Sequence, residues 1–102
     1  MKHATLAVIA AISSIGIDSP ALAAGDLQAG KVLSAACAAC HGANGQGMAQ
    51  YPALAGKNAD QLVQALKDFK SGKRDNVFMK GMASSLSDQD IENVAAYYAS
   101  LK

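Results

Sequence analysis

The segment CAACHGANGQG, residues 37–47, constrains this chain more than any other feature. Cys37 and Cys40 are the only cysteines among 102 residues, and His41 follows the second one directly. The only other histidine is His3, close to the N-terminus. Three groups that bind metals or react with cofactors therefore stand within five consecutive residues, and the function of the chain is expected to depend on them.

The first 23 residues have the pattern of a secretory signal peptide. Lys2 gives a positive start, residues 4–17 carry no charge, and Ala21-Leu22-Ala23 fits the small-x-small cleavage pattern. As a helix, the uncharged run would reach only about 21 Å, which is short of the roughly 30 Å hydrocarbon core. We therefore expect residues 1–23 to be cleaved, leaving residues 24–102 as a periplasmic domain without a stable membrane anchor.

The expected mature chain is one small domain of 79 residues. A domain of this size gains only marginal stability from apolar burial and usually needs a covalent or metal staple. A disulfide between cysteines three residues apart would close a very short loop and add little stability. Without Lys2 and Asp18, the domain has eight basic and seven acidic residues, so its charge gives no case for nucleic acid binding.

Three helices are predicted, over about residues 26–39, 58–71 and 87–101. Asp26, Asn58 and Ser87 are good N-cap residues, and Gly72 is a typical stop for the second helix. Apolar residues recur with helical spacing in each segment, and no segment shows strand alternation. The fold is therefore expected to be all-α. The two connections, residues 42–57 and 73–86, are predicted to be loops, and their length indicates that they fold around a ligand.

The C-x-x-C-H motif has three interpretations. A thioredoxin-like redox pair would follow a strand, and no strand is predicted before Cys37. A structural zinc site needs four ligands, whereas the mature chain offers only Cys37, Cys40 and His41 of the soft kind. The third interpretation, covalent attachment of haem c, matches the motif fully. In an exported chain without other cysteines, this interpretation is favoured.

The haem interpretation assigns a role to each residue of the motif. Cys37 and Cys40 would form thioethers with the haem, and His41 would bind the iron from one side. The mature chain has no second histidine, so methionine is the expected ligand on the other side. Met48 lies only seven residues after His41, which is close for a segment that must pass around the ring. Met79 and Met82 both suit the distal position, and spacing alone does not choose between them.

With these features the sequence resembles the small bacterial class I cytochromes c of the cytochrome c-553 type. The resemblance covers essentially the whole mature chain and rests on CAACHGANGQG, on YPALAGK at residues 51–57 and on MKGMASSLSDQDIENVAAYYASL at residues 79–101. It implies a small class I cytochrome c fold, with three main helices and loops wrapped around one covalent haem. In relatives the first methionine of the M-x-G-M element binds the iron, which implies Met79, with Met82 as the alternative axial ligand.

The resemblance also implies two structural contacts. The carbonyl of Pro52 is expected to accept a hydrogen bond from the ring of His41, which would fix the orientation of that ring. In this family the first and last helices cross closely, with a glycine against an aromatic residue. Gly30 and Tyr97 are the matching residues here, and a glycine inside a helix is consistent with close backbone approach.

The function implied is that of a periplasmic carrier that shuttles single electrons through haem c and is not an enzyme. Its partners would be redox proteins that dock transiently, a donor and an acceptor. Residues 67–80 hold five basic and two acidic residues, a local excess that would attract an acidic partner. The alternative is a haem-bearing electron-transfer subunit of a periplasmic dehydrogenase or oxidase complex.

Overall fold

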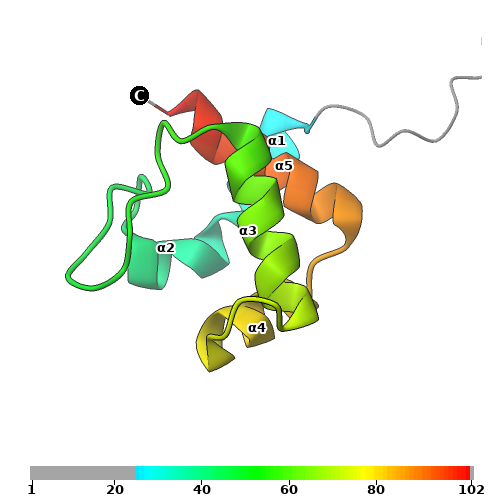
Figure 1. The fold of residues 1–102 in the computed structure, drawn as a ribbon. Helices are drawn as coiled ribbons and strands as arrows, with labels where there is room; N and C mark the ends of the chain where they lie inside the picture. The colour runs from blue at the N-terminus through cyan, green and yellow to red at the C-terminus, as the bar shows by residue number, and fades with distance from the viewer. Residues whose placement is uncertain (1–24, 102) are drawn as a thin grey trace, which may run out of the picture.

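A computed structural model describes residues 25–101, and the predicted signal peptide lies outside these residues. The described residues form five helices, which Figure 1 shows gathered into one body. They are α1 (Leu27–Leu33), α2 (Ala35–His41), α3 (Ala59–Ser71), α4 (Val77–Ser84) and α5 (Asp88–Ser100). Over the same residues, β pairing is limited to one isolated bridge between Met48 and Tyr51. The all-α prediction is confirmed.

The predicted first helix is interrupted at Ser34. Instead of one helix over residues 26–39, the chain forms α1 and α2, with Ser34 between them in a turn. The Ser34 hydroxyl donates to the carbonyl of Lys31 at 2.6 Å. A serine side chain that bonds to a nearby backbone carbonyl competes with the regular helical pattern and favours a bend. The interruption lets α2, with its cysteines and histidine, take its own direction.

Helices α1 and α5 cross in close contact, as Figure 1 shows at the upper right of the molecule. A Cβ atom on Gly30 would lie 2.0 Å from the carbonyl oxygen of Asn93 and 2.8 Å from Cβ of Tyr97. The backbone N–H of Asp26 also donates to the Asn93 side chain at 2.8 Å. The expected approach of Gly30 to Tyr97 is confirmed, and only glycine leaves room for it.

The prediction of a loop over residues 73–86 was wrong, because this segment contains α4. Asn76 provides the start of the helix: its side chain accepts the backbone N–H of Met79 at 3.0 Å. Asparagine is among the preferred N-cap residues, so a signal for this helix was present in the sequence. The apolar residues that follow did not reveal it, since Val77 and Phe78 lie on the surface.

The hydrophobic core lies mainly along α5. Ile91, Val94, Ala95 and Tyr98 are buried there, and Leu62 of α3 packs against the last three of them. Ser87 and Asp90 form a capping box at the start of α5, which satisfies backbone N–H groups there. Helix α3 packs on both α4 and α5. None of the helices in the described region has the length and apolar character needed to span a membrane.

We predict that Gly30→Ala destabilises the folded protein, because the new Cβ would overlap the backbone of α5. Overpacking of this kind costs about 1–3 kcal/mol, and each kcal/mol lowers the melting temperature of a domain this size by roughly 4–8 °C. Thermal unfolding measures the change. Gly81→Ala is the matched control, since its new Cβ would meet no atom within 4 Å apart from the nearby backbone of its own helix, and the substitution favours the helix. A melting temperature for Gly30→Ala equal to that of Gly81→Ala would contradict the close crossing.

Candidate functional site

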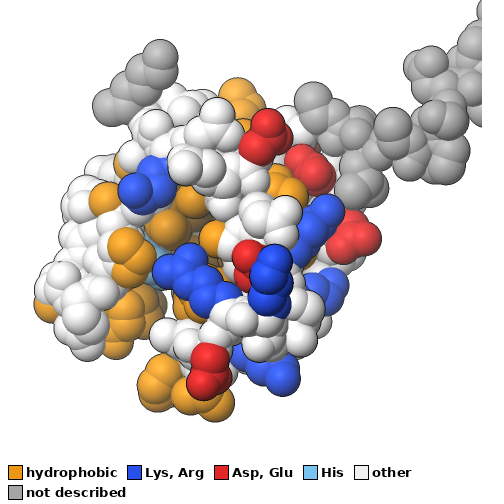
Figure 2. Space-filling view, in the orientation of Figure 1, with side chains coloured by type: hydrophobic (Ala, Val, Ile, Leu, Met, Phe, Trp, Pro, Cys, Tyr) orange, Lys and Arg blue, Asp and Glu red, His pale blue; other side chains and the backbone are white. Residues whose placement is uncertain are grey.

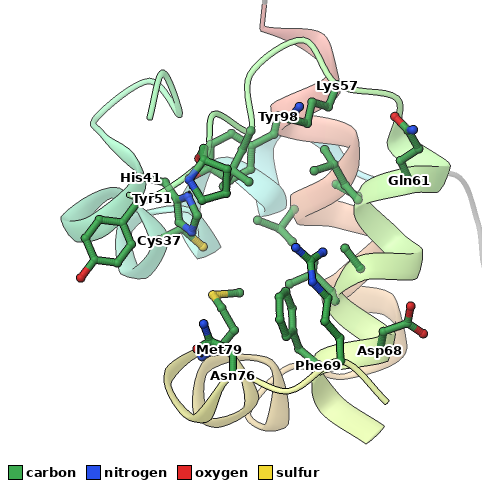
Figure 3. A pocket seen from close by; sticks show the side chains of 18 of the residues that line it. Cys37, His41, Tyr51, Lys57, Gln61, Asp68, Phe69, Asn76, Met79 and Tyr98 are labelled. Atoms are coloured by element: carbon green, nitrogen blue, oxygen red, sulfur yellow. Dashed lines mark hydrogen bonds between the residues drawn. The ribbon is translucent and has the colours of Figure 1, made fainter. Parts of the chain in front are cut away.

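A cavity of about 830 Å³ lies between α2, α3, α4, α5 and the segment that follows α2. Figure 3 shows that Cys37 and His41 lie on one side of it and Met79 on the other. Most of the wall is apolar, from α3, α4, α5 and the segment after α2 (Leu54, Leu62, Ala65, Leu66, Phe69, Phe78, Val94, Ala95). The volume is typical of a cavity that holds a small molecule or cofactor.

His41 is oriented by a hydrogen bond to a backbone carbonyl. Its Nδ1 atom lies 2.7 Å from the carbonyl oxygen of Pro52, which is the contact that the resemblance implies. A carbonyl only accepts, so Nδ1 must carry the proton and donate it, and in the neutral form of the ring Nε2 then has a free lone pair. The ring is only 6% exposed. A neutral imidazole held in this way is a well-prepared metal ligand.

The segment that carries Pro52 is folded back onto α2 and α5. The backbone N–H of Gly47 donates to the carbonyl of His41 at 2.7 Å, and the carbonyl of Gly45 accepts bonds from Leu54 and Ala55. Gly56 in turn donates to the carbonyl of Tyr98 at 2.9 Å. Positive φ angles at Gly45 and Gly47 allow these tight reversals, which a side chain would strain. The loop is therefore a fixed support for His41.

The two cysteines share one face of α2 but differ in exposure. They stand three residues apart in the helix, so they project from neighbouring turns. Cys37 is half-buried and lines the cavity, whereas Cys40 is exposed and is absent from its lining. Burial raises the pKa of the Cys37 thiol, and a hydrogen bond with Tyr98 offsets part of that rise. Burial and the neighbouring Cys37 also raise the pKa of the Tyr98 hydroxyl.

The three candidate methionines occupy different places. Met79 is partly buried and lines the cavity, and Figure 3 shows its sulfur atom directed toward Cys37 and His41. Met82 is 39% exposed, Met48 is 51% exposed, and neither lines the cavity. Although Met79 and Met82 share α4, only one of them faces the site. The structure thus separates two residues that spacing left equivalent.

The donor set and the cavity fit a covalently held haem. Two thiols on adjacent turns, an oriented imidazole and a thioether across an apolar space are groups that hold haem c. The sequence did not indicate the polar residues of the lining, which include Lys57, Asp68, Arg74 and Asn76. Arg74 stacks over the ring of Phe69 at 4.6 Å, which helps to hold the turn between α3 and α4. These residues come from three segments, before α3, within α3 and between α3 and α4, and no motif connects them.

Comparison with known proteins gives consistent matches. The family model described as Cytochrome c matches residues 27–102. Cytochrome c4 of Pseudomonas aeruginosa is 42% identical over 96 residues, which cover 93% of this chain and 48% of that protein. Cytochrome c-554(548) of Halomonas halodenitrificans is 44% identical over 81 residues, which cover 76% of this chain and 98% of that protein.

Solved structures agree with these matches. Reduced recombinant cytochrome c4 from Pseudomonas stutzeri superposes with a TM-score of 0.73 at 42% identity, over 78% of this chain and 47% of that one. The chain thus spans about half the length of the cytochrome c4 relatives that it matches. Its likeness to them concerns one domain and the site in that domain.

We predict that the Nδ1 proton of His41 exchanges slowly with solvent in the haem-loaded protein, because the ring is buried and the proton is held by the Pro52 carbonyl. Proton NMR after transfer to heavy water measures the rate. Pro52→Ala loosens the backbone at residue 52 and should speed the exchange by about two- to fivefold. Exchange that is complete within the dead time in the unmodified protein would contradict the bond.

Proposed function

The chain belongs to the cytochrome c family, as a small class I member, and on this premise we propose that it carries single electrons between redox proteins. The observation that carries this proposal is the opposition of His41 and Met79 across one apolar cavity that Cys37 also lines. Haem c supplies an iron atom that takes up and releases one electron. We propose that the chain holds one such group, since its two cysteines form a single attachment motif.

Each residue of the site has a role in this proposal. Cys37 and Cys40 hold the cofactor covalently, and Pro52 fixes the ring of His41 so that Nε2 is available to the iron. Met79 is proposed as the second axial ligand, supported by its place in the cavity, and Met82 stays the alternative. Because His41 and Met79 would both bind the iron, a substrate would find no free place on it. The chain is therefore proposed to be a carrier and not an enzyme.

The apolar wall suits electron transfer for a physical reason. Leu62, Val94 and Tyr98 are buried, so their side chains exclude water from the space between the ligands. An apolar, rigid surrounding limits the rearrangement that accompanies a change of charge, since few dipoles are free to turn. The packing of α5 thus contributes to both stability and function.

Partners are expected to dock near the start of α4. Val77 and Phe78 are 76% and 80% exposed, and Phe78 also lines the cavity. Figure 2 shows hydrophobic side chains at the lower edge of the molecule, with an acidic side chain directly beside them and basic side chains farther along the same face. A small apolar surface on a face with several basic side chains suits brief contact with an acidic redox protein. The electron donor and the electron acceptor are therefore proposed only as redox proteins with an acidic docking surface.

Export to the periplasm belongs to the same proposal. Its support is the signal-peptide pattern of residues 1–23, which lies outside the described residues, together with the C-x-x-C-H motif. The alternative function, a subunit of a dehydrogenase or oxidase complex, has less support. The chain matches 98% of the length of cytochrome c-554(548), so one domain of this size accounts for nearly the whole of that relative.

We predict that Met79→Ala abolishes the weak long-wavelength iron–sulfur absorption band of the oxidised protein and lowers its reduction potential. A thioether favours the ferrous state, and axial ligands set haem potentials over a range of about 0.8 V. Met82→Ala is the matched control, because it removes the same side chain from an exposed position one turn further along α4 that does not line the cavity. It should keep the band and shift the potential much less. Loss of the band in Met82→Ala alone would reverse the assignment.

A further inference from the structure

Helix α4, which carries Met79, is poorly anchored by apolar contacts. It has eight residues, and Ala83 is its only buried one. Val77, Phe78 and Met82 are exposed, so they remove little apolar surface from water. A helix of two turns is marginal by itself, and α4 has its main packing contact with α3 alone. Other interactions must therefore keep Met79 at the cavity.

The first of these interactions lies at the start of α4. The Asn76 side chain accepts the backbone N–H of Met79 at 3.0 Å and is the side-chain cap of this helix. The bond acts on the residue whose sulfur faces the cavity, and Asn76 itself lines the cavity, as Figure 3 shows beside Met79. Loss of the acceptor would free the first turn of α4 and, with it, the backbone of Met79.

The second interaction lies just after the end of α4. Lys70, near the end of α3, donates from Nζ to the carbonyl of Leu86 at 2.5 Å. This bond joins residues that are 16 positions apart and ties the segment after α4 back to α3. Leu86 packs against the core, so the bond is partly shielded from water. The segment with Met79 is thus held at both ends by a polar contact.

We propose that Asn76 and Lys70 are positioning residues that keep the Met79 sulfur at the cavity. This inference rests on the proposed binding of iron by Met79. The consequence is that Met79 can be exchanged for another ligand. When either contact is weakened, α4 moves away from the cavity and an external ligand takes the place of the Met79 sulfur. Neither residue is proposed to bind the iron; both act through the placement of α4.

The test is a titration of the oxidised haem-loaded protein with imidazole, which competes with the Met79 sulfur. The readout is the imidazole concentration that removes half of the iron–sulfur band. For Asn76→Ala we expect this concentration to fall by about fivefold, the factor that corresponds to a typical N-cap. For Lys70→Met we expect a fall of about threefold or more, because one hydrogen bond is lost.

Two matched controls remove the same kind of side chain, an asparagine cap or a lysine, at positions outside the segment that carries Met79. Asn58 caps α3 by accepting from the N–H groups of Asp60 and Gln61, so Asn58→Ala loses an equivalent cap. Lys67→Met removes the same charge from an exposed position on α3. Both controls should stay within about twofold of the unmodified protein, even if Asn58→Ala lowers the midpoint of global unfolding. Asn76→Ser keeps a capping oxygen and should restore the original value.

The outcomes separate this inference from the proposed function. Equal imidazole values for Asn76→Ala and Asn58→Ala would overturn the role of Asn76, and equal values for Lys70→Met and Lys67→Met would overturn the role of Lys70. A band that is missing from the unmodified protein, or unchanged in Met79→Ala, would overturn the binding of iron by Met79 and the inference with it.

Discussion

The close crossing of α1 and α5 is the constraint on which the rest of the structure depends. Gly30 lets the two backbones touch, and the bond from Asp26 to the Asn93 side chain fixes the start of α1 against α5. This contact joins the two ends of the described chain and makes a single core possible in so short a domain. It also places α2 at the end of α1, so that Cys37 and His41 face the wall formed by Val94 and Tyr98. The site is therefore a consequence of the crossing, and a change at Gly30 affects both.

The two sides of the cavity are supported in different ways. On the side of His41, backbone hydrogen bonds hold the loop of residues 42–56, and the Pro52 carbonyl fixes the ring. On the side of Met79, a short and largely exposed helix depends on a cap and on one lysine. Covalent attachment next to His41 would keep the cofactor in place even when the Met79 side opens. If His41 and Met79 bind the iron as proposed, His41 is held rigidly and Met79 is adjustable, and a docking partner at the exposed start of α4 would act on Met79.

The sequence predicts those features of the molecule that depend on residues close together in the chain. The motif at residues 37–41 and the caps Asn58 and Ser87 depend on adjacent residues, so three helical regions and one proposed ligand, His41, could be recognised. Helix α4 was missed because its apolar side chains lie on the surface and give no core pattern, although Asn76 marks its start. The break at Ser34 depends on one hydroxyl that bonds to the backbone. Tertiary packing decides that Met79 and not Met82 lines the cavity, and it brings α3 and α5 together as a shared wall; spacing in the sequence encodes neither.

The central claim is that Cys37 and Cys40 hold haem covalently, and mass spectrometry of the purified protein tests it most directly. Trypsin cleaves after Lys31 and Lys57, so residues 32–57 form one fragment that contains both cysteines and His41. After denaturation and reduction, our account predicts that this fragment carries the additional mass of one haem and has no thiol left to alkylate. A fragment with its unmodified mass and two alkylated cysteines, taken from protein expressed with haem and its attachment machinery, would contradict the account.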